Sequence, residues 1–230
     1  MSMPMRPHAP LLETVLDHIG LDIVSGKIQP GEKFTLQTLC ESFSISRTVA
    51  RETMRALEHL GMVASSRRVG ITVLPKDQWS VFAEPIIRWR LQIPAEREEQ
   101  LRSLTALREA IEPQAARITA IAASQKDALK MRELAEQMRA MGAQGRGASR
   151  EYLDLNIEYH AMILRCSGNE MFAALVPAIT AVITGHYDLG LFTESPKDQF
   201  IDLFEQLADA IYNREEDKAA ELTRQLLNAK

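Results

Sequence analysis

The chain has 230 residues, of which 46% are hydrophobic and 25% are charged, and its formal net charge is −4. These values are typical of a globular protein and exclude a disordered chain, a fibrous repeat and a uniformly basic nucleic-acid binder. The longest nearly uncharged apolar stretch, residues 173–183, is too short to span a bilayer, and the N-terminus lacks the apolar core of a signal peptide. Two cysteines cannot form a disulfide framework, so we expect a cytoplasmic protein with no membrane partner.

Basic residues gather in the first third of the chain. Residues 1–74 carry 8 Lys and Arg against 7 Asp and Glu, whereas the remaining residues carry 19 against 24. A local basic patch on an acidic protein can still attract a polyanion, because phosphate attraction acts over short distances at physiological salt. The uneven charge indicates two domains with different roles.

The first 75 residues have the pattern of a small helical domain that ends in a hairpin. Apolar residues at helical spacing predict three helices, over residues 10–25, 36–43 and 47–60. Ser46 is a suitable N-cap for the third helix. Two short strands are expected after it, over residues 62–64 and 71–74. This order predicts a winged helix–turn–helix in which residues 47–60 form the recognition helix.

The predicted recognition helix has a basic face. Its apolar residues repeat at helical spacing, and the opposite side carries Arg47, Arg51, Arg55 and Glu58. A charged helix face is usually only solvated. Here the short turn before the helix and the Arg67-Arg68 pair at the expected hairpin tip favour DNA binding instead.

The rest of the chain is predicted to be helical, so the expected fold class is mostly α. Residues 76–96 are expected to form a linker with a connecting helix, and residues 97–230 an all-helical antiparallel bundle of about six or seven helices. Ser195 and Pro196 have the pattern of a capped helix start. The other helices are expected over residues 79–91, 97–123, 126–142, 149–167 and 170–190, with a last one beginning near residue 215.

Four polar residues interrupt the apolar stripes of the bundle, and they are Arg108, Asn156, His160 and His186. A buried guanidinium needs a partner, and its planar fork suits a carboxylate. That partner can be an internal acid or a ligand, and an inward histidine is more often a hydrogen-bonded core residue than a ligand contact. Two histidines are too few for a zinc site, and no nucleophile–base pair or phosphate loop is present, so no enzyme activity is expected.

The chain resembles the gluconate-operon-repressor (GntR) family of regulators, fatty-acid-regulator subfamily, with a C-terminal FCD effector domain. The pieces that carry this resemblance are residues 25–31, 39–43, 46–48, 51–52 and 57–63 in the first domain, and 107–113, 158–160, 167–169 and 210–211 in the second. The resemblance implies a homodimer on a pseudo-palindromic DNA operator, whose affinity changes when the helical domain binds an effector.

The resemblance also implies which residues contact DNA. They lie at the start of the recognition helix and at the hairpin, and they are Ser46, Arg47, Thr48, Arg51, Arg67, Arg68 and Gly70. Gln37 stands where the fatty-acid regulator has a DNA-contacting arginine, which is a departure that can alter the preferred operator.

Many FCD domains bind a divalent metal through an aspartate and three histidines. Here the aspartate position is Asn156, His160 is kept, and the two later positions fall on Phe204 and Leu226. We therefore expect no metal cofactor. Instead, Arg108 is expected to bind the carboxylate of a small effector, with Asn156 and His160 on its hydroxyls and His186 as a fourth contact.

The segment from Lys76 to Trp89 is similar to the linker helix of galactonate-responsive members, which suggests a sugar acid as the effector. The favoured function is a repressor of a sugar-acid or other small-carboxylate catabolic operon. One alternative is a constitutive DNA-binding protein whose helical domain serves only dimerisation. Another is an enzyme that uses His160 and His186 on a bound metal.

Overall fold

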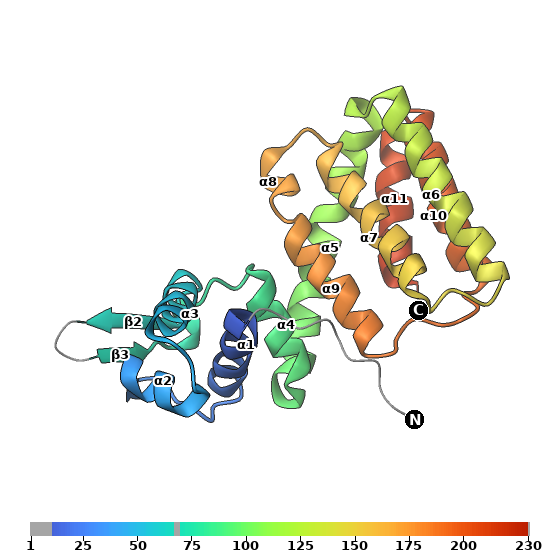
Figure 1. Cartoon of the computed structure of the whole chain (residues 1–230). Helices are drawn as coiled ribbons and strands as arrows, with labels where there is room; N and C mark the ends of the chain where they lie inside the picture. Colours follow the sequence, from blue (N-terminus) through green and yellow to red (C-terminus); the bar gives the residue numbers. More distant parts are fainter. Residues whose placement is uncertain (1–10, 67–69, 230) are drawn as a thin grey trace. The chain divides into compact units, whose positions relative to one another are not determined.

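The computed structural model describes residues 11–66 and 70–229 and divides the chain into two compact units, Met1–Gln100 and Leu101–Lys230 (Figure 1). The expected wing residues Arg67 and Arg68 lie outside the described residues. Each unit encloses its own hydrophobic core.

The first unit is a winged helix–turn–helix, as predicted. Its elements in chain order are α1 (Leu11–Val24), β1 (Lys33–Phe34), α2 (Leu36–Phe43), α3 (Arg47–His59), β2 (Val63–Ser66) and β3 (Gly70–Val73). The strands form an antiparallel sheet in the order β1-β3-β2. The sequence pattern missed β1, because a two-residue strand is too short to show alternation.

Helix α3 begins as its sequence predicts. Ser46 has extended backbone geometry, and its hydroxyl accepts a hydrogen bond from the Val49 amide at 3.3 Å. Ala50, Met54 and Leu57 are buried on one side of the helix, which leaves the arginine face in solvent. The N-cap and the apolar stripe together fix which side chains point outward.

The segment expected to be a linker belongs to the first unit and packs against α1. A short 3₁₀ turn, η1 (Lys76–Gln78), precedes α4 (Glu84–Gln92), so the helix starts later than predicted, with Pro85 in its first turn. The fully buried Trp89 donates its indole N–H to Asp17 of α1 at 2.9 Å. Its ring also lies over Gly20, where a Cβ atom would come within 2.6 Å of ring carbons.

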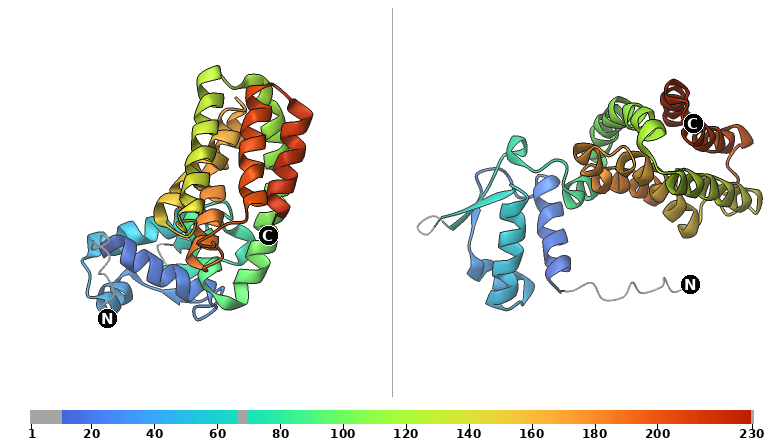
Figure 2. Two further views of the ribbon diagram at one scale, coloured as in Figure 1. Left: turned by 90° about the vertical axis from the view of Figure 1, so that its right-hand side faces the viewer. Right: turned by 90° about the horizontal axis from the view of Figure 1, so that it is seen from above.

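The second unit is the helical bundle (Figures 1 and 2). It consists of most of α5 (Pro94–Ala122), followed by α6 (Gln125–Ala143), α7 (Arg150–Arg165), α8 (Glu170–Ala173), α9 (Val176–Asp188), α10 (Asp198–Tyr212) and α11 (Glu216–Asn228). Helix α10 packs against α6 and α11, and α7 packs against α6 and α9. The predicted antiparallel bundle is confirmed.

Two details of the bundle differ from the sequence prediction. The single helix expected over residues 170–190 is divided into α8 and α9, because Pro177 lies in the first turn of α9 and cannot donate a backbone hydrogen bond. Ser195 does not cap α10. The helix begins at Asp198, and its N-cap residue, Lys197, makes no side-chain capping bond.

Within the described residues, one helical stretch, Glu170–Asp188, has the length and composition of a membrane span. This is weak evidence, because core helices of globular proteins meet the same criterion. The stretch includes α9, whose Ile179, Val182 and Ile183 are buried in the bundle.

Candidate functional site

The exposed face of α3 is the first candidate site. Arg47, Thr48 and Arg51 are exposed there, and neither arginine has an ion-pair partner among the residues that the structure describes. Arg55 differs, because it donates to Glu52 at 2.8 Å on the same helix. The arginines near the start of α3 are therefore available to a polyanion.

The other predicted DNA contacts are arranged around this helix. Ser46 is occupied as the N-cap, and the exposed Gln37 of α2 donates to Glu41 at 2.9 Å. Gly70 begins β3 with a φ of 86°, and a Cβ atom there would lie 2.9 Å from the Phe34 carbonyl oxygen. The close approach of the β1 and β3 backbones therefore explains why position 70 is a glycine.

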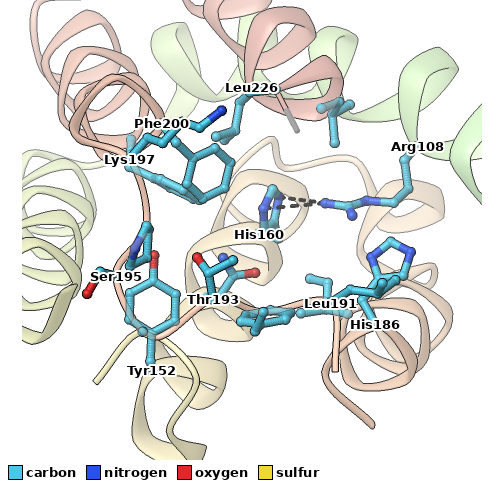
Figure 3. Close-up of a pocket in the computed structure, with 18 of the residues that line it drawn as sticks. Arg108, Tyr152, His160, His186, Leu191, Thr193, Ser195, Lys197, Phe200 and Leu226 are labelled. Carbon is cyan, nitrogen blue, oxygen red and sulfur yellow. Dashed lines mark hydrogen bonds between the residues drawn. The ribbon is translucent and has the colours of Figure 1, made fainter. Parts of the chain in front are cut away.

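The second candidate site is a cavity of about 760 Å³ inside the bundle, a volume typical of small-molecule sites (Figure 3). It is bounded by side chains of α5, α7, α9, α10 and α11 and by the loop between α9 and α10. The four predicted effector residues, Arg108, Asn156, His160 and His186, all line it. Its described lining includes no Asp or Glu, so it suits a ligand with negative charge.

A buried ion network lies at one side of this cavity. Glu112, on α5, is fully buried and accepts a hydrogen bond from Arg108 Nε at 2.5 Å. Its other oxygen lies 2.7 Å from His160 Nδ1 on α7. Arg108 Nη2 is 3.2 Å and 3.3 Å from the two ring nitrogens of His160, the contacts drawn in Figure 3. Glu112 is therefore the internal acidic partner of Arg108, which is one of the two alternatives that the sequence pattern allowed.

The network fixes the protonation of its members. Burial alone would raise the pKa of Glu112, but the charge of Arg108 and the hydrogen bonds from Arg108 and His160 lower it to about 2. Burial lowers the pKa of His160, and the adjacent charge of Arg108 lowers it as well. The charge of Glu112 and its hydrogen bond with His160 act in the opposite direction. A carboxylate can only accept, so neutral His160 carries its proton on Nδ1, and its Nε2 is the ring nitrogen that accepts from Arg108 Nη2.

Several polar groups remain unpaired at the cavity. Arg108 Nη1 and the side-chain amide of Asn156 make no hydrogen bond to any described residue. His186 is half-buried, and burial together with the charge of Arg108 lowers its pKa. The cavity thus presents donors from Arg108 and Asn156 beside a histidine acceptor, an arrangement that fits a carboxylate with neighbouring hydroxyls.

Three residues of this site were not predicted from the sequence. Glu112 lies one helical turn after Arg108, a spacing that signals an ion pair, but the motif around it gave it no role. Tyr152 was given no role, yet its buried hydroxyl has no hydrogen-bond partner among the described residues and its ring lines the cavity. Lys197 lies at the end of a loop, where no periodicity marks a residue as inward or outward.

The residues at the metal positions do not fit a divalent ion. Phe204 and Leu226 supply only apolar surface to the cavity, and His160 Nδ1 is bonded to Glu112. The Arg108 guanidinium beside both ring nitrogens of His160 would repel a cation. In the described parts of the chain, no group of three or more His, Cys, Asp or Glu side chains is placed to hold a metal.

Family comparisons identify both units. The model of the gntR family of bacterial regulatory proteins matches residues 11–73, and the FCD domain model matches residues 103–229. The chain belongs to the GntR family and carries an FCD domain. It is therefore a DNA-binding transcriptional regulator with an effector-binding domain, and not an enzyme.

Relatives of this GntR-family chain agree with that assignment. It is 24% identical over 214 residues to the uncharacterized HTH-type transcriptional regulator YieP of Escherichia coli K12, covering 90% of this chain and 88% of YieP. It is 24% identical over 162 residues to the HTH-type transcriptional regulator LutR of Bacillus subtilis, covering 70% of each.

Solved structures share the fold. Streptococcus agalactiae GntR superposes with a TM-score of 0.52 at 18% identity, covering 95% of this chain and 98% of that one. Escherichia coli McbR/YncC gives 0.53 at 15% identity, covering 96% and 95%. At these identities the likeness is evidence for the fold alone.

The exposed arginines of α3 predict sequence-specific binding by this GntR-family regulator. We expect Arg47→Ala or Arg51→Ala to weaken binding to an operator selected from random DNA by about 1–3 kcal/mol, the value of a bidentate arginine–guanine contact. Binding to random DNA should fall much less. Fluorescence anisotropy with both DNAs measures the difference.

Two controls accompany that measurement. Arg55→Ala, on the same helix but with its side chain paired to Glu52, should change operator binding least. Arg68→Ala, at the position where the sequence predicts the hairpin tip, should weaken binding to operator and random DNA evenly through lost phosphate attraction. Equal losses on both DNAs for Arg47→Ala and Arg51→Ala would contradict the assigned role of α3.

The buried network predicts acid-sensitive stability. The pKa of Glu112 is lowered, so its contribution is complete above its unfolded value of about 4.5 and is lost as the pH falls toward 2. A shift of this size corresponds to on the order of 3 kcal/mol. The pKa of His160 is also lowered, so its contribution is lost as the pH falls below about 6.5. Urea unfolding at a series of pH values measures both losses.

Matched variants isolate the part due to Glu112. Arg108→Met should destabilise the protein by about 3–5 kcal/mol at neutral pH, because it leaves the buried Glu112 carboxylate without a cationic partner. The double variant Arg108→Met/Glu112→Gln should recover most of that stability and lack the loss between about pH 4.5 and 2. A double variant with the same acid profile as the wild type would show that Glu112 is not the group responsible.

Proposed function

We propose that this GntR-family protein is a homodimeric repressor that binds a pseudo-palindromic operator and is released when its FCD domain binds a small carboxylate, such as a sugar acid. The observation that carries the effector class is the cavity. Arg108, Asn156 and the two histidines line it together, and no described Asp or Glu lies in its wall. A hydroxylated acid offers the groups that these side chains complement.

The ion network supports a specific mode of carboxylate binding. Glu112 accepts hydrogen bonds from Nε and Nη2 of Arg108. The effector carboxylate therefore binds the remaining donors of the guanidinium, chiefly those on Nη1. The Asn156 amide donates beside it. His160 Nε2 accepts from Arg108 Nη2, so this ring positions the guanidinium beside the effector hydroxyls, and His186 is a fourth contact.

Effector binding is proposed to be independent of metal. In metal-binding FCD domains the ion supplies the positive charge that attracts an acid. Here the Arg108 guanidinium lies beside His160. Phe204 and Leu226 place apolar side chains at the positions of the other metal ligands. The apolar side favours an acid with fewer hydroxyls than a full aldonic acid.

Calorimetry with aldonic and 2-keto acids, before and after chelation, tests the effector proposal. We expect binding to survive chelation, to be weakened by His160→Asn, and to be abolished in the double variant Arg108→Met/Glu112→Gln, whose fold is checked by circular dichroism. Loss of binding on chelation, or normal binding by the double variant, would refute the carboxylate mode. If no acid binds while operator DNA does, the constitutive DNA-binding alternative is favoured.

The dimer proposal has its own measurement. One recognition helix reads only a few base pairs, so two half-sites require two copies of α3. We expect a homodimer in sedimentation equilibrium at micromolar concentration and one dimer on each operator. A monomer that binds the whole operator would contradict the proposal.

A further inference from the structure

A second group of polar side chains lies across the cavity from Arg108. Figure 3 shows Tyr152, Ser195 and Lys197 on one side of the pocket and Arg108 with His186 on the other. Ser195 and Lys197 belong to the segment that leads into α10, and Tyr152 belongs to the first turn of α7. The cavity therefore has two separate polar ends.

Tyr152 is the first sign that this end binds a ligand. Its side chain is 1% exposed, its hydroxyl has no hydrogen-bond partner within the described chain, and burial raises its pKa to about 12. A buried hydroxyl without a partner is costly and uncommon. Because the residue lines the cavity, a ligand group there would supply the missing hydrogen bond.

Lys197 supplies positive charge at the same end. It lines the cavity, and no described acid forms an ion pair with it, whereas Glu112 balances the charge of Arg108. Lys197 is also the N-cap residue of α10, where free backbone amides favour an anion, and no side chain caps the helix. Glu194 and Asp198 flank this segment, but neither lines the cavity.

The loop that carries these groups is held in place. The Gly147 amide donates to the Glu194 carbonyl at 2.7 Å, and a Cβ atom at position 147 would meet Pro196 at 2.4 Å. The Phe192 ring packs edge-on against Tyr152, with 6.2 Å between ring centroids. These contacts keep the loop and the Tyr152 hydroxyl at one end of the cavity.

We propose that Tyr152 and Lys197, with the hydroxyl of Thr193, form a subsite for a second acidic group, so that the effector is a dianion. This inference rests on the proposed function, in which Arg108 binds the first carboxylate. The second group is a carboxylate or a phosphate, both of which accept several hydrogen bonds and carry negative charge.

Matched pairs of acids test the subsite. Butyrate with succinate, gluconate with glucarate, and glycerate with phosphoglycerate each compare one acidic group with two. We expect the dianion of at least one pair to bind more tightly than its monoacid by on the order of tenfold to hundredfold, the value of a charge-assisted hydrogen bond. The diacid and phosphoacid arms distinguish carboxylate from phosphate.

Variants assign the preference to its residues. Lys197→Gln should remove the difference within the pair, and Tyr152→Phe should reduce it without lowering the melting temperature, because only an unpaired hydroxyl is lost. Lys130→Gln, on the exposed surface of α6, is the matched control. Equal binding within every pair, or a preference that survives Lys197→Gln, would overturn the subsite. If neither the monoacids nor the dianions bind, the result contradicts the proposed function itself and not only the subsite.

Discussion

The burial of one carboxylate organises the effector domain. Glu112 has no exposed surface, and a lone charge in that position would destabilise the fold by several kcal/mol. Arg108 and His160 prevent this, and in doing so they join α5 to α7. The same contacts orient the guanidinium, set the histidine tautomer and leave selected donors and acceptors facing the cavity. The shape and the polarity of the pocket both depend on this network.

The fold could largely be read from the sequence, because most of its elements carry local signals. The recognition helix has an N-cap at Ser46 and an apolar stripe, and the structure has both. The sequence predictions were wrong where tertiary contacts determine whether an element forms or where it begins. Strand β1 exists only because Lys33 and Phe34 pair with β3, and α10 starts at Asp198 although Ser195-Pro196 has a better capping pattern.

The candidate site was less predictable. Arg108, Asn156, His160 and His186 were found because they interrupt apolar stripes, and all four line one cavity. That rule finds polar residues in apolar surroundings, but it cannot tell which of them satisfy one another. It therefore gave no role to Glu112. Nor can periodicity reveal that a tyrosine hydroxyl lacks a partner, because that depends on what lies around it in three dimensions.

The packing of Trp89 over Gly20 has a consequence for spectroscopy. The chain has two tryptophans, Trp79 and Trp89, and both are buried in the first unit, whereas the cavity lies in the second and has no tryptophan in its described wall. Tryptophan emission is thus an intrinsic reporter of the DNA-binding unit alone. A change in emission on titration of an effector would record coupling between two distinct sites, without any attached dye.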